Sequence, residues 1–440
     1  MTLISNWSNY PVVDTKINSF SSAKELSNKL NDAQELIIRG NGRCYGDASL
    51  NENIVSCLSF NKFLFFDKVN GVIEVQAGVL LDDILKVIIP SGWFLPVTPG
   101  TKFISIAGAV ASDVHGKNHH VDGSISNHII SIKLMLADGQ IISCSQKENV
   151  ELFWATCGGM GLSGVILTVK FSVKPIKSSY IAQTTIKAKS LDEILALFEE
   201  NKDATYSVAW IDCLKGGKNF GRSLLMLGEH FKNGDKKIKL KEPFKVHADP
   251  HLSIPINFPE FALNKYSIKL FNTLYYHKAF TKIKESIGHY DGFFYPLDAI
   301  LSWNKMYGKR GFAQYQFVIP IEERKGLEVI LKKIQAKGMG SFLAVLKVFG
   351  EQNNLISFPM KGYTLALDFA IQDKLFDFLD ELDKIVLSYG GRIYMTKDSR
   401  MHKDVFWQGY PEAQKFVETI KKYNPNGRIN SMLSKRLEIL

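Results

Sequence analysis

The chain of 440 residues is long enough for two or three domains, and its 45% hydrophobic and 22% charged residues are typical of a folded globular protein. Its five cysteines are widely spaced and form no Cys-x-x-Cys motif, which argues against a disulfide framework and a structural zinc site. The net charge of +10 favours an anionic partner, whether a phosphate-bearing ligand, a nucleic acid or a membrane surface.

The sequence shows no targeting or membrane-spanning segment. The first twenty residues lack a basic stretch followed by an apolar run, and no stretch approaches the roughly 18 apolar residues that cross a bilayer. We therefore expect a cytoplasmic protein, with a peripheral contact to a membrane surface as an open hypothesis.

The first part of the chain predicts short strands and helices. Ser22 and Glu25 fit a capping box that begins a helix running to about Leu30. Hydrophobic periodicity then predicts a short strand that runs into a glycine loop at 36–42. It also predicts a strand at 72–78 and an amphipathic helix at 80–88.

A β-hairpin follows. The stretch IKLMLADGQIISC (132–144) alternates in hydrophobicity on both sides of Asp138-Gly139, which is a strong hairpin signal. ELFWATCGG (151–159) predicts a helix that glycine ends, and VILTVKFSV (165–173) predicts a strand.

Beyond about residue 178 aromatic residues become dense. FAQYQFVIP (312–320) and GYTLALDFAI (362–371) predict strands, with a helix at 322–338 between them. This pattern indicates an α+β domain with an aromatic-lined face, although most individual rings are expected to belong to the core.

Three glycine-rich loops could hold a phosphate-bearing cofactor. They are GNGRCYGD (40–47), PGTKFISIAGA (99–109) and GGMGLSG (158–164). The last contains G-x-G-x-x-G, but it follows a predicted helix and precedes a strand, which is the reverse of the Rossmann arrangement. Glycine lets a backbone approach a ligand closely, so the three loops together fit a large cofactor with a pyrophosphate and a ring system.

Three histidines cluster in ASDVHGKNHHVDG (111–123). A metal site is disfavoured because no H-E-x-x-H motif and no neighbouring cysteine accompanies them. We therefore expect no metal at these histidines.

Several longer motifs carry a family resemblance. They are R-G-x-G-R-x-Y-G-D (39–47), V-x-A-G-V-x-L (75–81), P-V-x-P-G-T (96–101), H-G-K-N-H-H (115–120), E-L-F-W-A-T-x-G-G-x-G-L (151–162) and Y-x-x-K-D-S-R (394–400). Together they resemble the vanillyl-alcohol-oxidase class of FAD-binding oxidoreductases, and within it the decaprenylphosphoryl-β-D-ribose 2′-oxidase family.

The resemblance implies an α+β fold with a PCMH-type FAD-binding domain and an inserted α+β substrate domain. The expected division is 1–178 for the FAD-binding domain, 179–391 for the substrate domain and 392–440 for a segment that completes the FAD-binding domain. The implied reaction is oxidation of the 2′-hydroxyl of a polyprenylphosphoryl-β-D-ribose to a ketone, by hydride transfer to flavin N5. A partner keto-sugar reductase would then complete an epimerisation to the arabinose donor used in cell-wall polymers.

The resemblance also implies roles for individual residues. Lys397, His115 and Tyr45 match catalytic positions, and Lys397 is the expected active-site lysine. His119 and His120 are expected to hold the loop through hydrogen bonds. Implied substrate contacts are Trp210, Gln314, Gln316, Lys347, Thr364 and Lys397. Implied FAD contacts are Arg39, Gly40, Asn41, Gly42, Arg43, Cys44, Tyr45, Gly46, Asp47, Gly100, Thr101, Ser105, Ile106, Ala107, Gly108, Ser112, His115, Gly116, Asn118, Ile166 and Tyr394.

The sequence departs from some relatives in ways that matter for chemistry. Arg43 stands where oxidases with covalently bound FAD carry a histidine, and positions 101–103 offer no cysteine, so we expect non-covalent FAD. Ala366 replaces the cysteine of mycobacterial members, Thr364 an asparagine, and Phe294-Tyr295 a Tyr-His pair. These changes put inhibitor sensitivity and substrate choice in doubt.

Alternatives stay open at this stage. An FAD-dependent oxidase or dehydrogenase of a soluble alditol or aldonolactone fits the same superfamily. A basic nucleic-acid-binding protein fits the charge but not the flavin motifs, so no nucleic-acid partner is expected. The lysine-rich stretch 232–247 suits anionic lipid headgroups, which motivates the hypothesis of membrane contact.

Overall fold

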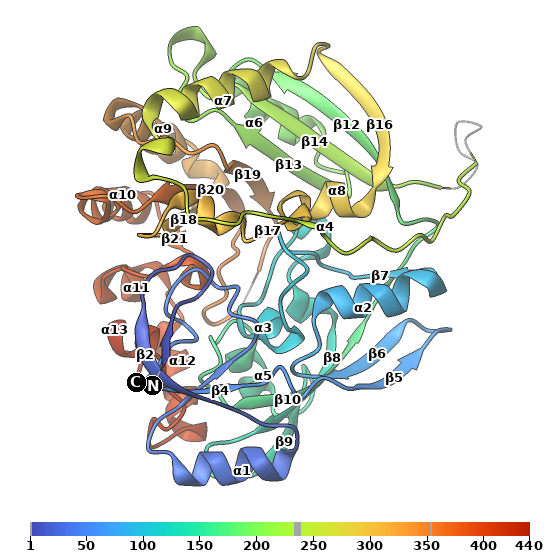
Figure 1. The fold of residues 1–440 in the computed structure, drawn as a ribbon, viewed down its shortest axis with the longest axis vertical. Coiled ribbons are helices and arrows are strands. Elements are labelled where there is room, and N and C mark those ends of the chain that lie inside the picture. Colours follow the sequence, from blue (N-terminus) through green and yellow to red (C-terminus); the bar gives the residue numbers. More distant parts are fainter. Residues whose placement is uncertain (1, 233–238, 353) are drawn as a thin grey trace.

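The computed structural model describes residues 2–232, 239–352 and 354–440 and shows two lobes (Figure 1). The lysine-rich stretch 232–247 therefore lies partly outside the described residues. Within the described residues, no helix combines the length and the apolar character needed to cross a membrane.

The lower lobe contains two small sheets. The first is mixed, with strand order β1-β2-β4-β3, and the second is antiparallel, with order β5-β6-β10-β8-β9. Their strands are β1 (Thr2–Ile4), β2 (Val13–Ser19), β3 (Ile37–Arg39), β4 (Asn53–Ser56), β5 (Phe63–Asp67), β6 (Val72–Gln76), β8 (Ile129–Met135), β9 (Ile141–Cys144) and β10 (Val165–Ser172). A short pair, β7 (Trp93–Phe94) with β11 (Lys174–Pro175), leads toward the upper lobe.

The helices of the lower lobe come from both ends of the chain. Those before residue 178 are α1 (Ala23–Asp32), α2 (Leu81–Ile88), α3 (Ile106–Ala111), α4 (His119–Asp122) and α5 (Val150–Thr156). Those after residue 392 are α11 (Lys403–Gly409), α12 (Ala413–Tyr423) and α13 (Met432–Arg436). The returning chain packs α12 against α5 and exchanges backbone hydrogen bonds between Leu36 and residues 428–430.

The upper lobe is built on an eight-stranded antiparallel sheet, with strand order β16-β12-β14-β13-β19-β20-β18-β21. Its strands are β12 (Tyr180–Ala188), β13 (Tyr206–Ile211), β14 (Ser223–His230), β16 (Ile283–His289), β18 (Phe312–Pro320), β19 (Ala344–Phe349), β20 (Gly362–Ala370) and β21 (Arg392–Ile393). Its helices are α6 (Leu191–Glu200), α7 (Lys265–His277), α8 (Tyr290–Phe294), α9 (Lys325–Lys337) and α10 (Leu375–Ser388). A short parallel pair, β15 (Leu252–Ser253) with β17 (Ile300–Leu301), lies outside this sheet.

The elements predicted from periodicity are confirmed. The Ser22 hydroxyl accepts the backbone N–H of Glu25, and α1 begins there. β8 and β9 pair antiparallel around Gly139, which adopts a left-handed φ of 88°. β10 is almost wholly buried because it lies between β6 and β8, and this position explains its continuous apolar run.

The α+β fold class is likewise confirmed. The division at residues 178 and 391 stays a prediction, although the arrangement is compatible with it: β12 begins the upper sheet at Tyr180 and β21 ends it at Ile393. Residues 392 and 393 of the predicted C-terminal segment still pair with β18, and the chain then enters the lower lobe.

Candidate active site

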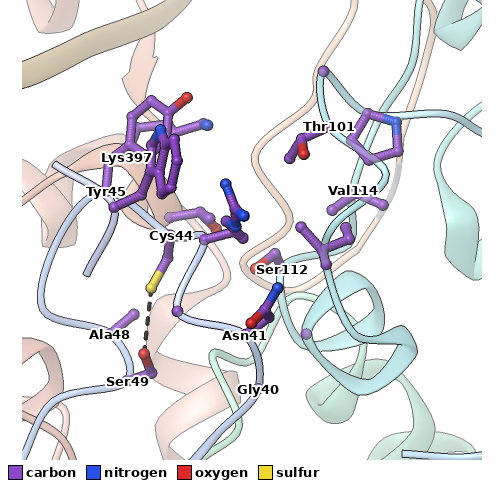
Figure 2. Close-up of a pocket in the computed structure, with 18 of the residues that line it drawn as sticks. Gly40, Asn41, Cys44, Tyr45, Ala48, Ser49, Thr101, Ser112, Val114 and Lys397 are labelled. Atoms are coloured by element: carbon purple, nitrogen blue, oxygen red, sulfur yellow. Dashed lines mark hydrogen bonds between the residues drawn. The ribbon is translucent and has the colours of Figure 1, made fainter. Parts of the chain in front are cut away.

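A cavity of about 320 Å³ lies between the two lobes, within the size range of ligand sites in proteins. One wall is formed by three loops of the lower lobe, 40–45, 99–105 and 160–164. Residues of α3 complete this wall. Figure 2 shows Gly40, Asn41, Thr101, Ser112 and Val114 around this space.

The glycine wall leaves room for a cofactor. A Cβ atom added to Gly100 or Gly161 would meet no protein atom within 4 Å, and both glycines line the cavity. The backbone of these loops can therefore lie directly against a flat ring or a pyrophosphate. Gly42 has a different constraint, since its left-handed φ of 61° is a conformation that glycine adopts without strain.

The opposite wall is one face of three neighbouring strands. Gln316 pairs directly with Ala366, and Gln314 with Asp368, across β18 and β20. Val345 on β19 faces Ala366 from the other side. Because side chains alternate along a strand, these residues share one face of the sheet, and all of them line the cavity.

Lys397 projects into the cavity from the short turn that follows Tyr394. Its ammonium lies 3.5 Å from the centroid of the Tyr45 ring, and the two side chains lie together in Figure 2. Burial lowers the pKa of Lys397 to about 8, and the negative charge of Asp368 opposes that fall. The lysine can therefore exchange a proton close to neutral pH.

Asp368 is the acidic partner of this lysine. Its carboxylate accepts hydrogen bonds from Gln314 at 2.5 Å and from the hydroxyl of Tyr307 at 3.4 Å. Burial raises the pKa of Asp368 to about 6, while the Gln314 hydrogen bond and the charge of Lys397 act in the opposite direction. Between these two pKa values the carboxylate is ionised and the lysine is protonated.

A second lysine adds positive charge to the cavity. Burial, with a smaller contribution from the charge of Lys397, lowers the pKa of Lys347 to about 7. Burial also holds the pKa of His115 well below its usual value, with smaller contributions from Lys347, His119 and Lys397. His115 is therefore neutral near pH 7.

The neighbours of His115 define its orientation. The amide nitrogen of Gln316 lies 3.3 Å from Nε2, and in this amide orientation it donates to the ring, which matches the neutral tautomer protonated on Nδ1. Nδ1 is buried and has no hydrogen-bond partner among the described residues. Phe349, Phe358 and Tyr394 pack around the ring, with centroid separations from 4.6 to 5.7 Å.

The other residues of the histidine-rich segment contact protein backbone. His119 accepts the N–H of Gly350 at 3.2 Å, and His120 lies 2.9 Å from the carbonyl of Ala204. The Lys117 ammonium donates to the carbonyl of Phe293. These contacts connect the segment to the upper lobe and are compatible with the predicted loop-holding role of both histidines.

Within the described residues, three candidate metal ligands lie within 4.8 Å of one another at a different place. They are Asp82, His247 and Asp249. The Lys86 ammonium lies 2.9 Å from both carboxylates and offsets one of their two negative charges. This group does not line the cavity.

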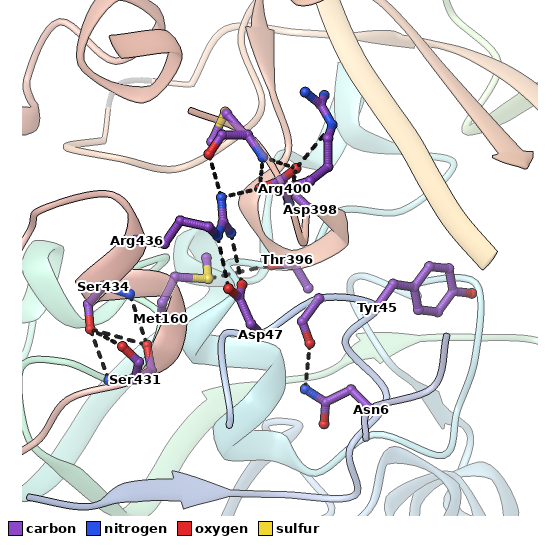
Figure 3. A network of polar contacts seen from close by, with 12 residues as sticks. Asn6, Tyr45, Asp47, Met160, Thr396, Asp398, Arg400, Ser431, Ser434 and Arg436 are labelled. Atoms are coloured by element: carbon purple, nitrogen blue, oxygen red, sulfur yellow. Dashed lines mark hydrogen bonds and ion pairs between the residues drawn. The ribbon is translucent and has the colours of Figure 1, made fainter. Parts of the chain in front are cut away.

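A buried ion network fixes the two chain segments that carry Tyr45 and Lys397 (Figure 3). Arg436 makes two hydrogen bonds of 2.9 Å to Asp47 and lies 3.0 Å from Asp398. The backbone N–H of Tyr45 donates to the carbonyl of Thr396 at 3.0 Å. Both carboxylates are nearly fully buried, so they need nearby cations: Arg436 pairs with both, and the Arg400 guanidinium lies 3.9 Å from Asp398.

Gly46 completes this junction. A Cβ atom at this position would lie 1.5 Å from the carbonyl oxygen of Asp398. The loop can therefore approach the 395–401 turn only because residue 46 has no side chain.

The structure brings most of the predicted site residues together. Those that line the cavity are Gly40, Asn41, Gly42, Arg43, Cys44, Tyr45, Gly100, Thr101, Ser105, Ala107, Gly108, Ser112, His115, Ile166, Gln314, Gln316, Lys347, Tyr394 and Lys397. Those that do not are Arg39, Gly46, Asp47, Ile106, Gly116, Asn118, Trp210 and Thr364.

The residues outside the lining have recognisable positions. Arg39 donates to Ser5 and Asn6, and Asn118 donates to the carbonyl of Pro96 at 2.8 Å. Thr364 lies behind Gln316, 3.3 Å from its amide nitrogen. The Trp210 indole donates to the carbonyl of Phe342 and packs against Tyr275 of α7.

Sequence reasoning did not single out several residues of the lining, among them Asp368, Asp298, Trp7, Trp303 and Met160. The sequence did contain a signal for Asp368. It is the one acidic residue in the apolar stretch GYTLALDFA, and its spacing of two from Ala366 places both residues on the same face of the strand. The aromatic residues carried no such signal.

Comparisons with known proteins agree with this geometry. A family model for an FAD-binding domain matches residues 19–145. Decaprenylphosphoryl-β-D-ribose oxidase of Mycolicibacterium smegmatis is 36% identical over 412 residues, which cover 92% of this chain and 89% of that protein. L-Gulonolactone oxidase of Mus musculus is 31% identical over 117 residues, only 26% of each chain.

A solved structure shows the same fold. Physcomitrella patens BBE-like 1 superposes with a TM-score of 0.66 over 94% of this chain and 89% of its own, at 14% identity. FAD is thus the cofactor, as the sequence predicts, and the glycine wall has the space to hold it.

The mode of FAD attachment is open to a direct test. Cys44 and Cys57 line the cavity, but burial raises the pKa of both thiols, to about 12 for Cys57, so neither forms the nucleophilic thiolate. We expect acid denaturation to release all of the FAD into the supernatant, measured by flavin absorbance. A pellet that stays yellow would contradict non-covalent binding.

Removing the guanidinium of Arg436 should destabilise the lower lobe. Arg436→Gln removes the guanidinium paired with the buried carboxylate of Asp47 and leaves Asp398 with Arg400 at 3.9 Å, and we expect a loss of about 3 kcal/mol in the free energy of unfolding. Chemical denaturation of the FAD-loaded protein measures it. Lys435→Gln is the matched control, because Lys435 pairs with Glu35 at the exposed surface and should change stability by less than about 1 kcal/mol. Equal effects of both substitutions would show that the network contributes little.

Proposed function

This chain belongs to the decaprenylphosphoryl-β-D-ribose oxidase family and is an FAD-dependent oxidoreductase, and we propose that it oxidises the 2′-hydroxyl of a polyprenylphosphoryl-β-D-ribose to the 2′-keto sugar. The product would pass to a keto-sugar reductase that completes the epimerisation to an arabinose donor. The observation that carries the proposal is that Lys397 enters the same cavity as Asp368 and Gln314, which lie on the wall opposite the cofactor loops.

When bound, FAD supplies the hydride acceptor, at N5 of its ring system. Hydride removal from a secondary alcohol also requires the hydroxyl proton to leave, and a base with a pKa near the working pH does this best. Lys397 has such a pKa, about 8, and accepts the proton in its neutral form. Asp368 stabilises the ammonium that results.

Other residues position the sugar in this scheme. Gln314 and Gln316 offer amide groups on the strand face beside Asp368, and Lys347 offers a cation for the anionic substrate. His115 is held neutral by burial and contacts Gln316, so it acts in orientation and not as the base.

The cavity lining favours a lipid-linked substrate over a small polyol. Trp7, Leu297, Trp303 and Leu343 give one side of the cavity an apolar surface. A prenyl chain gains free energy when it leaves water for such a surface, whereas an alditol or aldonolactone has no apolar part to place there.

Anaerobic titration distinguishes the two substrate classes. We expect farnesylphosphoryl ribose to bleach the flavin absorbance, and ribitol and aldonolactones to leave it unchanged at the same concentration. Bleaching by the free sugars alone would overturn the proposed substrate class.

Lys397→Ala should separate chemistry from cofactor binding. We expect the variant to keep FAD, because Lys397 forms no part of the glycine wall, and to reduce the flavin about 10²–10⁴ times more slowly. Stopped-flow absorbance under anaerobic conditions measures this rate. Lys403→Ala, at an exposed ion pair with Glu438, is the control and should behave as the wild type. Near-normal reduction by Lys397→Ala would remove this residue from the mechanism.

The pH profile tests the pairing of Lys397 with Asp368. If the neutral amine is the base, flavin reduction in the wild type accelerates as pH rises through about 8. Asp368 raises the pKa of Lys397, so Asp368→Asn should move the rising limb to lower pH. Asp373→Asn, at an exposed carboxylate paired with Arg310, should leave the profile in place. A shift to higher pH in Asp368→Asn would contradict the assignment.

A further inference from the structure

The outer side of α7 is apolar where a surface helix is normally polar. Ile268, Asn272 and Tyr276 recur every four residues and are buried against the sheet. Tyr266, Leu270 and Leu274 form a second row with the same spacing on the opposite side, and they are 82%, 62% and 64% exposed. Because the sheet covers only one apolar side of α7, the other apolar side is expected to bind a partner or a membrane.

Further exposed apolar residues precede and follow α7 in the sequence. Ile256 and Phe261, which precede α7, and Phe280, which follows it, are 70%, 78% and 96% exposed. We call the set of Ile256, Phe261, Tyr266, Leu270, Leu274 and Phe280 the apolar ridge. Several large apolar side chains in one stretch of sequence exceed the scattered exposure that is normal for a protein surface.

Positive charge accompanies the apolar ridge. Residues 265–284 contain five lysines and no acidic residue. Lys265, Lys269 and Lys278 are exposed on or directly after α7. Apolar side chains bordered by lysines are the chemistry that an interfacial helix uses to bind anionic lipid.

The helix that carries the apolar ridge lies near the cavity. Trp210, which α7 covers, pairs with Val345 of β19, so α7 and the cavity lie on the same face of the large sheet. Phe271 of α7 contacts Phe342, with ring centroids 5.5 Å apart, and the next residue, Leu343, lines the cavity. Consecutive residues of the chain thus contact α7 and the cavity, so the helix lies close to the substrate site.

We propose that the apolar ridge docks on the surface of a bilayer containing anionic lipid, so that a prenyl chain can pass from the bilayer into the cavity. The proposal deepens the proposed function and rests on it for the lipid-linked substrate. Phe280 and the side chains of the outer row of α7 enter the interfacial region, and the flanking lysines bind the headgroups.

Vesicle co-sedimentation of the FAD-loaded, full-length protein tests the docking without any substrate. We expect binding to phosphatidylcholine vesicles that contain phosphatidylglycerol, and weaker binding in high salt or to phosphatidylcholine alone. Leu270→Gln with Leu274→Gln should lower the partition coefficient about tenfold or more. Leu3→Gln with Val12→Gln, at exposed apolar residues of the lower lobe, is the matched control and should bind as the wild type.

Two further measurements separate the outcomes. In a vesicle-free assay with a prenylphosphoryl ribose whose chain is too short to enter a bilayer, the Leu270→Gln, Leu274→Gln protein should be as active as the wild type.

Wild-type protein that does not sediment, or equal sedimentation by both double variants, would overturn the docking proposal. Light scattering that shows a wild-type oligomer dissociated by the ridge substitutions would assign the ridge to a second copy instead. Absence of vesicle-free oxidation by the wild type would count against the proposed reaction, independently of docking.

Discussion

The charge balance around Arg436 holds the active site together. Asp47 belongs to the first glycine loop and Asp398 to the turn beside Lys397, and the Arg436 guanidinium contacts both carboxylates. Gly46 allows these segments to touch, since any side chain there would meet the backbone of Asp398. Tyr45 and Lys397 consequently face each other as neighbours of the same network, and the proposed chemistry depends on that placement.

The two walls of the cavity have different compositions and different proposed roles. The lower-lobe wall is largely backbone and small side chains, which suits close packing against the cofactor. The upper-lobe wall carries the titratable groups, because strand alternation puts Gln314, Lys347 and Asp368 on one face of the sheet. Burial lowers the pKa of Lys397 to about 8, and the charge of Asp368 keeps it from falling further, so the amine can take up a proton close to neutral pH.

Local signals explain what the sequence alone predicted well. The caps and alternation that define α1, β8, β9 and β18 depend on neighbours a few residues away, and those elements are confirmed. Long-range contacts explain the remainder. The motif around Asp47 does not reveal whether that carboxylate contacts the cofactor or holds the loop, because its partner Arg436 is 389 residues distant. The ring of Trp210 is covered by α7, and neither the sequence around Trp210 nor that of α7 predicts this contact.

The distance in sequence between Asp47 and Arg436 also bears on the order of events during synthesis. The first glycine loop emerges early from the ribosome, yet the residue that neutralises it is made 389 positions later. During synthesis this ion pair can therefore form only after the strands of the upper sheet have been translated. Until then the first glycine loop lacks the guanidinium that pairs with Asp47 in the finished protein.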